Sequence, residues 1–327
     1  MTYNIQTTLF TNDLFNISVN EKCIFVFALG YEERSVFIID KILKMPVHNN
    51  ITIVPFIFDD YIPSEPTSKI IELLATYNIT PINVAYNDYN KVLETVAAIV
   101  NNISGKDIIL HFDYSSMPRS WYCRFPMLVK NHHGALCKLY FWYSAGDYES
   151  NGDGFPSAGV RDIRSFSGRA TLRPINSRTH IFGLGFDHVR TQGIMSVLDP
   201  SYYGACYAYP FSDFSMLKKV KKENEELINS SDFSFELPLH DFHFMMAKLS
   251  DLANTLVHKG DVIFIPDGPK PLILACSLVP TVVPRKGVVC LHVKRHDQYY
   301  EAVNVKAKGD IFGFCYESYL PSADCIL

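Results

Sequence analysis

Short apolar runs rich in β-branched and aromatic residues alternate along the chain with longer stretches in which apolar positions recur at helical spacing. Such runs predict buried strands, and the longer periodic stretches predict the helices that connect them. In the first half, strands are predicted at 23–29, 51–58, 81–85, 107–112 and 136–143, and helices at 33–44, 66–77, 89–103 and 118–131. In the second half, strands are predicted at 179–184, 203–209, 261–265 and 287–293, and helices near 188–198, 213–229, 240–258 and 271–279. This alternation is typical of an α/β fold with mainly parallel sheets.

The chain resembles itself at an offset of about half its length. Residues 25–34 and 181–190 each form an apolar run that ends in glycine, aromatic, acid and then arginine, which places Gly30 and Gly185 155 positions apart. Residues 105–113 and 259–267 also match, because each begins with a glycine and a lysine and ends in an aspartate after an apolar run, and the two final aspartates lie 154 positions apart. Three further matching pairs lie 153 positions apart: Cys123/Cys276, Gly134/Gly287 and Cys137/Cys290. Matching blocks in one order predict an internal duplication.

Two similar Rossmann-like halves, residues 1–172 and 173–327, follow from this duplication. Each half is expected to end in an antiparallel addition. Glycine and polar residues over 146–154, followed by a basic stretch over 161–178, predict a hairpin and then the connection between the halves.

Composition narrows the class of protein. The 327 residues are 48% hydrophobic and 20% charged, which excludes a disordered or coiled-coil chain. The formal net charge of -4 argues against a protein that coats duplex nucleic acid. The sequence shows no secretory signal and no apolar run long enough to span a bilayer, and its eight cysteines are scattered without a Cys-x-x-Cys pair. We therefore expect a soluble cytoplasmic protein with buried thiols and no membrane partner.

The loops after the fourth predicted strand of each half carry candidate binding residues, because ligands of open parallel sheets bind beyond the carboxyl ends of the strands. In the first half, Asp113 is followed by Ser115, Ser116 and Arg119 at a helix start. In the second half, Asp267 and Lys270 flank a tight turn. Free backbone N–H groups and a basic side chain at a helix start suit an anion. The alternative is that the serines only cap a helix and that the basic residues are solvated.

The loops after the first strand combine acids with an arginine: Glu32 with Arg34, and Asp187 with Arg190. A dinucleotide-binding loop is not predicted, since the glycine pattern is incomplete and the acids would repel a pyrophosphate. Acid beside arginine suits contacts to a ribose or base edge, or a metal. The alternative is an internal salt bridge that braces the loop.

Two Rossmann-like units, each with a glycine loop after strand one and a loop that opens a later helix, resemble the CARF and SAVED sensory domains of bacterial defence proteins. The segment from Asp113 to Arg119 looks like the family's helix-start loop, with Ser116 and Met117 where the family usually has two glycines. The resemblance implies a cyclic oligonucleotide ligand lying across a cleft shared by two facing units. It also implies a role in antiviral defence and a separate effector protein as partner.

The leading hypothesis is a nucleotide-binding sensor or regulatory subunit with its ligand in the cleft between the halves. Arg119 and Lys270 would neutralise phosphate, Ser115 and Ser116 would donate hydrogen bonds, and Glu32 and Asp187 would contact sugar or base. Arg34, Arg190, Asp113 and Asp267 complete the predicted site. Stacking surface would come from Tyr31, Tyr114 and Phe186. No cofactor and no metal site are predicted.

Two other classes of function remain open on the sequence. Acids and arginines from several strand ends would also suit a hydrolase that cleaves or processes a nucleotide by general acid/base chemistry or with a divalent metal. A scaffold subunit that docks a protein partner would bind no small molecule at all.

Overall fold

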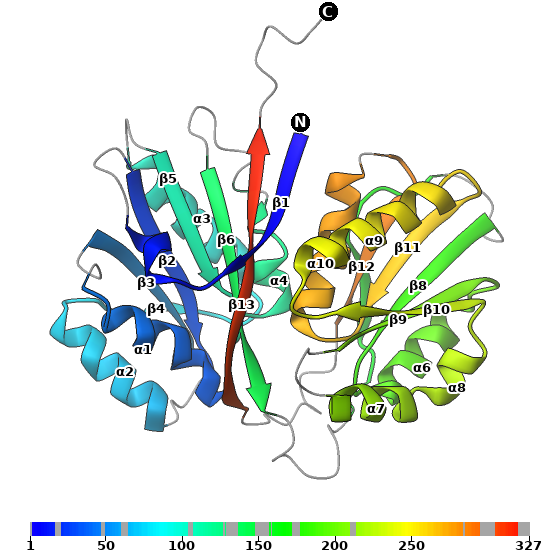
Figure 1. Cartoon of the computed structure of the whole chain (residues 1–327), viewed down its shortest axis with the longest axis horizontal. Coiled ribbons are helices and arrows are strands. Elements are labelled where there is room, and N and C mark those ends of the chain that lie inside the picture. The colour runs from blue at the N-terminus through cyan, green and yellow to red at the C-terminus, as the bar shows by residue number, and fades with distance from the viewer. Residues whose placement is uncertain are drawn as a thin grey trace, which may run out of the picture. The chain divides into compact units, whose positions relative to one another are not determined.

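The computed structural model describes residues 2–16, 21–46, 50–59, 65–103, 107–126, 128, 137–147, 157, 159–171, 177–209, 214–283, 285–294 and 305–319. The chain divides into two compact units. Unit 1 comprises Met1–Gly152 together with Val303–Leu327, and unit 2 comprises Asp153–Ala302. The elements are labelled in Figure 1.

Unit 1 is built on one sheet with the strand order β1-β13-β6-β5-β2-β3-β4. The strands are β1 (Thr2–Leu9), β2 (Glu21–Leu29), β3 (Ile51–Phe58), β4 (Ile82–Val84), β5 (Asp107–Asp113), β6 (Cys137–Asp147) and β13 (Lys306–Tyr319). The five strands from β6 to β4 run parallel, while β13 is antiparallel to β6 and to β1. Its helical elements are η1 (Asn12–Phe15), η2 (Glu33–Val36), α1 (Phe37–Leu43), α2 (Glu65–Thr76), α3 (Tyr89–Asn101) and α4 (Arg119–Tyr122).

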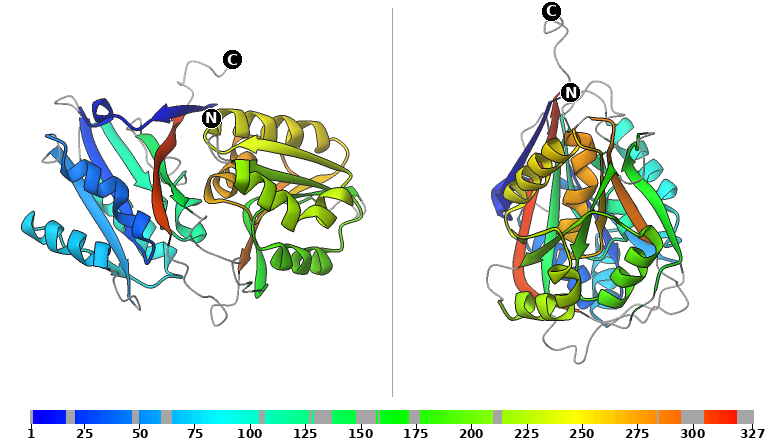
Figure 2. Two further views of the ribbon diagram at one scale, coloured as in Figure 1. Left: turned by 60° about the horizontal axis from the view of Figure 1, so that its bottom comes forward. Right: turned by 90° about the vertical axis from the view of Figure 1, so that its right-hand side faces the viewer.

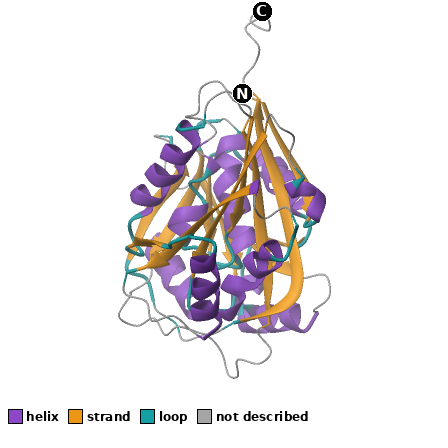
Figure 3. Cartoon of the chain, turned by 90° about the vertical axis from the view of Figure 1, so that its left-hand side faces the viewer, coloured by secondary structure: helices purple, strands orange, loops and turns teal. Residues whose placement is uncertain are grey.

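Unit 2 has a second sheet with the order β10-β9-β8-β11-β12-β7. Its strands are β7 (Asp162–Gly168), β8 (Arg178–Leu184), β9 (Tyr203–Tyr209), β10 (Phe233–Pro238), β11 (Asp261–Pro266) and β12 (Val288–Lys294). All neighbours are parallel except β7, which is antiparallel to β12. The helices are α6 (His188–Leu198), α7 (Phe214–Glu223), α8 (Glu225–Asn229), α9 (Phe242–Leu256) and α10 (Lys270–Val282). Figure 3 shows the helices of the chain in purple and the strands in orange.

The five parallel strands of the two sheets follow the same order. Counted along the chain within each unit, the fifth strand lies beside the fourth, followed by the first, second and third: β6-β5-β2-β3-β4 in unit 1 and β12-β11-β8-β9-β10 in unit 2. This is a doubly-wound order, in which the strand sequence reverses beside the first strand. The predicted α/β class with two mainly parallel sheets is therefore confirmed, and the shared order fits the predicted duplication, which stays a prediction.

Both faces of the central strands are buried, as expected for parallel sheets that helices cover on two sides. In β2, residues on alternate sides such as Ile24 and Phe25 are fully buried. One face packs against α1 and α2 through Ile38, Ile42 and Leu74. In unit 2, Phe182 and Leu184 of β8 share a core with residues of α6, α7 and α8.

Several elements differ from those predicted. The strand β10 was not predicted because its alternating, half-exposed residues at a sheet edge give little apolar signal. The predicted helix 213–229 is two helices that meet at Asn224, and of the predicted helix 118–131 the structure describes α4 and a few residues beyond it. The predicted hairpin at 146–154 falls almost wholly outside the described residues, and 162–168 in the predicted connection is the strand β7.

The boundary between the units also differs from the predicted division at 172/173. Strand β7 belongs to the sheet of unit 2, and β13 returns to the sheet of unit 1. β13 lies beside β1 in Figures 1 and 2, in the register Thr2↔Tyr319 to Leu9↔Phe312. Each sheet thus has one strand antiparallel to its fifth parallel strand: β13 pairs with β6 in unit 1, and β7 pairs with β12 in unit 2.

Candidate functional site

The loops after the first and fourth strands of each unit meet at a glycine. A Cβ atom placed on Gly30, after β2, would stand 2.9 Å from Cβ and Oγ of Ser116, after β5. A Cβ on Gly185, after β8, would stand 2.7 Å from the carbonyl oxygen of Asp267 and 3.0 Å from Cα of Gly268, after β11. Only a residue without a side chain allows these close approaches. In both units, therefore, the two predicted loops form one edge of the sheet.

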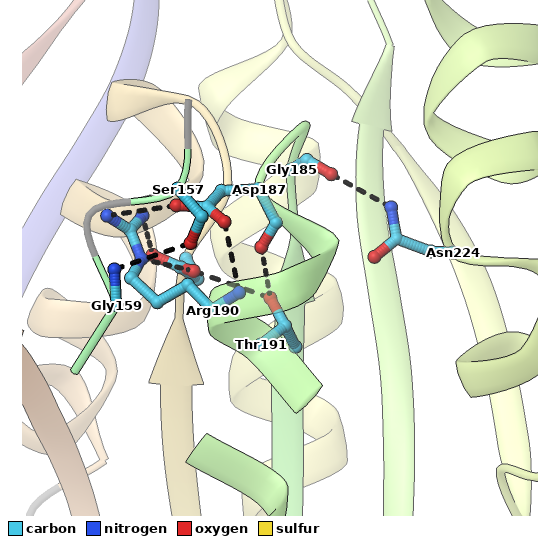
Figure 4. A network of polar contacts seen from close by, with 8 residues as sticks. Ser157, Gly159, Gly185, Asp187, Arg190, Thr191 and Asn224 are labelled. Carbon is cyan, nitrogen blue, oxygen red and sulfur yellow. Dashed lines mark hydrogen bonds and ion pairs between the residues drawn. The ribbon is translucent and has the colours of Figure 1, made fainter. Parts of the chain in front are cut away.

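The carbonyl oxygen of each of these glycines accepts a hydrogen bond from a side chain that follows the second parallel strand of its unit. Thr67 Oγ1 of α2 and Ser35 Oγ donate to the Gly30 carbonyl oxygen at 3.4 and 3.3 Å. Asn224 Nδ2 donates to the Gly185 carbonyl oxygen at 2.8 Å, as Figure 4 shows. Asn224 was not predicted as part of the site. Its signal in the sequence is a poor helix former in the middle of a predicted helix.

In unit 1, the acid and arginine after β2 pair with each other. Arg34 Nε donates to Glu32 Oε2, and Arg34 Nη1 donates to Tyr143 Oη at 2.9 Å and to the Ser144 carbonyl oxygen at 3.2 Å. Arg34 is only 2% exposed. Its backbone N–H donates to the Val305 carbonyl oxygen, just before β13, at 3.1 Å. The guanidinium is thus neutralised within unit 1 and braces the loop.

In unit 2, the arginine connects the two loops (Figure 4). Arg190 Nε donates to Asp267 Oδ2 at 2.8 Å and Arg190 Nη2 to Asp267 Oδ1, a bidentate pair. Arg190 Nη1 lies 3.6 Å from Asp187 Oδ2, while Asp187 Oδ1 caps α6 by accepting from the Arg190 backbone N–H at 3.0 Å. Thr191 Oγ1 also donates to Asp267 Oδ2, at 3.3 Å. The ion pair is buried and joins the loop after β8 to the loop after β11.

The loop after β5 is held mainly by its own polar groups. Asp113 Oδ1 accepts from the Ser115 backbone N–H at 2.9 Å, and Ser115 Oγ accepts from the Ser144 backbone N–H at 2.8 Å. Both Asp113 and Ser115 are buried. Ser116 Oγ, in contrast, is buried and has no hydrogen-bond partner within the described part of the chain.

The helices that follow these loops begin alike. Pro118 is the N-cap of α4 (φ -61°, ψ 147°) and Pro269 is the N-cap of α10 (φ -65°, ψ 153°), and neither offers a side-chain cap. Arg119 and Lys270 are the first helical residues, and both are partly exposed. An ungapped alignment of the halves would place Pro118 opposite Pro271, but the helix starts place it opposite Pro269.

Other helices of the same units have a carboxylate at this position. Asp88, Asp187 and Asp241 each accept from a backbone N–H of the first turn of α3, α6 and α9. An N-cap aspartate satisfies one of the four unpaired N–H groups of a helix start and adds negative charge there. At α4 and α10, the N-cap prolines cannot cap with a side chain, and a basic residue stands in the first turn instead of a carboxylate at the cap.

The predicted site residues thus separate into two groups. Six are buried and interact with other residues of the same unit. The other four are partly exposed at the strand-end edges. The buried residues are Glu32, Arg34, Asp113, Ser115, Arg190 and Asp267. The partly exposed residues are Ser116, Arg119, Asp187 and Lys270. For the acid–arginine pairs, the structure has the internal salt bridges that the sequence left as the alternative.

The predicted stacking residues separate in the same way. Tyr31 and Phe186 are partly exposed. Tyr114 is 1% exposed and packs between Tyr122 and Tyr143, with ring centroids 5.2 and 5.5 Å away. Burial raises the pKa of the Tyr114 and Tyr122 phenols, so both stay protonated. Tyr114 therefore serves the core and offers no stacking surface.

Within the described residues, no three His, Cys, Asp or Glu side chains lie close enough together to hold a metal ion. The six cysteines whose surroundings are described are buried and carry no disulfide. Among the described helices, none is long and apolar enough to cross a bilayer.

Comparison with known proteins adds no family. No protein-family model and no curated protein matches the chain. Among solved structures, the cytoplasmic domain of a prokaryotic cation chloride cotransporter aligns at a TM-score of 0.25 and 6% identity, over 84% of this chain and 96% of that one. An N-terminal ketoreductase from a macrolactin assembly line aligns at 0.24 and 6%, over 88% and 72%. An α-glucosyltransferase in complex with UDP aligns at 0.20 and 9%, over 79% and 78%. At these TM-scores the similarities assign neither family nor function to the chain.

Proposed function

We propose that the chain binds a phosphate-containing nucleotide at the strand-end edges where α4 and α10 begin. The observation that carries the proposal is the pair of helix starts with a proline N-cap and a basic first residue, Arg119 and Lys270. The N-terminal end of a helix with a cation beside it suits phosphate oxygens. The same arrangement recurs after the fourth strand of both units.

The burial and hydrogen bonds of three of the four acids in the predicted site favour binding over catalysis. Glu32, Asp113 and Asp267 are buried, and each accepts a hydrogen bond from its own unit. A general base must reach the proton that it removes. These carboxylates hold the loops in place. Arg119 and Lys270 are partly exposed. Under this proposal the protein is a nucleotide sensor that acts on a separate effector protein.

Titration calorimetry with a panel of mononucleotides and cyclic oligonucleotides tests the proposal. We expect the Arg119→Ala, Lys270→Ala double variant to lose at least about tenfold in affinity, since each hydrogen bond to a charged group contributes about 1.5–3 kcal/mol. The matched control is Lys69→Ala, Lys248→Ala, which removes the same charge from exposed positions of both units. Equal affinity in the two double variants would refute the site, and a nucleotide recovered in cleaved form would favour the hydrolase.

A further inference from the structure

Basic side chains gather at the amino ends of the parallel strands of unit 2. The neighbouring strands β8, β11, β12 and β7 each have at least one cation at this edge, since β7 is antiparallel and ends where β12 begins. Neighbouring strands lie about 4.8 Å apart, so the four strands span roughly 15 Å. Four of these cations are exposed and one is partly exposed. The five residues, which we call the basic row, are Arg169, Arg178, Lys259, Arg285 and Lys286.

The segments that carry the basic row touch one another. The backbone N–H of Gly287, before β12, donates to the carbonyl oxygen of Arg169, after β7, at 2.9 Å. The backbone N–H of Val262 in β11 donates to the Gly287 carbonyl oxygen at 2.7 Å. A Cβ atom on Gly260, before β11, would stand 1.3 Å from the carbonyl oxygen of Ser177, before β8. The cations therefore belong to one continuous edge of unit 2.

Carboxylates do not neutralise the basic row. Among the described residues, none of its five side chains forms an ion pair, whereas Lys69, Lys138 and Lys221 each meet a carboxylate. Asp261 begins β11 at this edge, but it is fully buried and accepts from the backbone N–H and Oγ1 of Thr171 at 2.9 and 2.5 Å. Five like charges in so short a span repel one another, and an anionic partner would relieve the repulsion.

The two arginines with described polar surroundings keep their charge. Arg285 Nη1 lies 2.8 Å from His258 Nε2, and because a guanidinium only donates, the imidazole nitrogen accepts. Arg178 Nε is buried and has no hydrogen-bond partner within the described part of the chain. Burial and, to a smaller extent, the charge of Arg178 lower the pKa of the His180 imidazole. Neither guanidinium meets a carboxylate of the described residues.

The fold does not require cations at this edge. In unit 1, β2 and β5 take the places of β8 and β11 in the strand order. These strands begin with the acids Glu21 and Asp107, which lie opposite each other in the register. The basic row is therefore a property of unit 2 and not of the shared topology.

We infer that the basic row is a docking surface for an acid-rich segment of a partner protein. An extended polypeptide advances about 3.3 Å per residue, so about five residues with alternating carboxylates would cover the row. A nucleic acid fits less well, because the chain carries a net charge of -4. In addition, the described parts of the segments that carry the row contain no Phe, Tyr or Trp on which bases could stack.

Fluorescence anisotropy of a labelled peptide of about ten alternating Glu and Ser residues, mixed with the intact chain at about 0.05 M ionic strength, tests the inference. The test variant is Lys259→Gln, Lys286→Gln. The matched control is Lys218→Gln, Lys222→Gln, which removes the same charge from exposed positions of α7. We expect the test variant to lose at least about tenfold in affinity and the control less than about twofold, since the attraction is screened beyond a Debye length of about 14 Å at this ionic strength.

Both double variants should keep the urea midpoint of the unmodified chain, because the substituted side chains are exposed and no described carboxylate pairs with them. Lys270→Ala should bind the peptide as the unmodified chain does, because Lys270 lies at the opposite end of β11. No binding to the unmodified chain, equal affinity of the two double variants, or a tenfold loss in Lys270→Ala would overturn the inference. Tighter binding of a single-stranded oligonucleotide of equal charge would assign the row to a nucleic acid instead. No nucleotide enters these measurements, so their outcome is independent of the proposed function.

Discussion

The strand-end edges of the two units carry the same residue types and use them differently. In unit 1, Arg34 pairs with Glu32 of its own loop. In unit 2, Arg190 reaches across to Asp267 in the neighbouring loop. The helix starts, in contrast, are alike, with a proline cap and then Arg119 or Lys270. The ion pairs that brace the loops therefore differ between the units, whereas the partly exposed basic residues at the helix starts occupy the same position in both. Binding at both edges would require this similarity.

The largest effect is expected when the bridge between the loops of unit 2 is broken. Asp267→Ala leaves the buried Arg190 without its bidentate partner and should lower the free energy of unfolding by about 3–5 kcal/mol. Glu32→Ala should cost less, because Arg34 keeps Tyr143 and a backbone carbonyl as acceptors. Urea unfolding followed by far-UV circular dichroism measures both.

The control for this pair is Asp187→Ala, which removes the cap of α6 but leaves the bidentate pair. Its expected cost is about 1 kcal/mol. If Asp267→Ala and Asp187→Ala destabilise equally, the bridge between the loops does not hold them together.

The glycines at the close approaches should also respond unequally. Gly185→Ala forces a Cβ against the backbone of Asp267 and Gly268 and should cost about 1–3 kcal/mol. Gly30→Ala meets only the side chain of Ser116, so its cost should be lower, and Ser116→Gly should restore it. Thermal unfolding of the three variants provides the measurement, and a Gly30→Ala loss that Ser116→Gly does not relieve would contradict the packing.

A pH effect should distinguish the cores of the two units. His111 of β5 is fully buried between the rings of Phe15 and Tyr140, and burial lowers its pKa from 6.5 to about 3. Between these values the unfolded chain binds the extra proton, so stability present above pH 6.5 is lost as the pH falls, by about 1.4 kcal/mol per pH unit. Burial also lowers the pKa of His180 of β8, which is less deeply enclosed.

Both tryptophans, Trp121 and Trp142, are buried in unit 1, so their fluorescence reports unfolding of that unit. Urea midpoints at about pH 7.5, 6 and 5 give the slope, and His111→Asn should flatten it by about one proton. The Asn carbonyl is chosen to accept from Trp142 Nε1, which donates to His111 Nδ1 at 3.0 Å. An unchanged slope in this variant would assign the pH dependence to other groups.

The smallest effect is expected at the hydrogen bonds to the glycine carbonyls. Asn224→Ala leaves the Gly185 carbonyl oxygen without its buried donor and should cost about 1 kcal/mol or somewhat more. Thr67→Val should cost less, because its bond is long and Ser35 also donates to Gly30. Urea unfolding decides the order, and a larger loss in Thr67→Val would reverse the comparison.

Much of the fold was predictable because burial of one or both faces leaves a local pattern. Most parallel strands and most connecting helices follow the expected ranges. The loops after strands one and four were also found from the sequence, since position at a strand end is a local property. Strand β10 and the cap residue Asn224 gave weak signals, the first because an edge strand is half exposed and the second because its bond joins distant segments.

The sequence by itself determined the α/β class, the location of the candidate loops and the basic residues at two helix starts, because apolar periodicity and chain order are read locally. Only the tertiary structure decided which carboxylate each arginine meets and which sheet receives β7 and β13. An ion pair or a strand pair forms between groups far apart in the chain. Any open sheet edge offers the same N–H and C=O groups, so the choice between edges rests on three-dimensional packing.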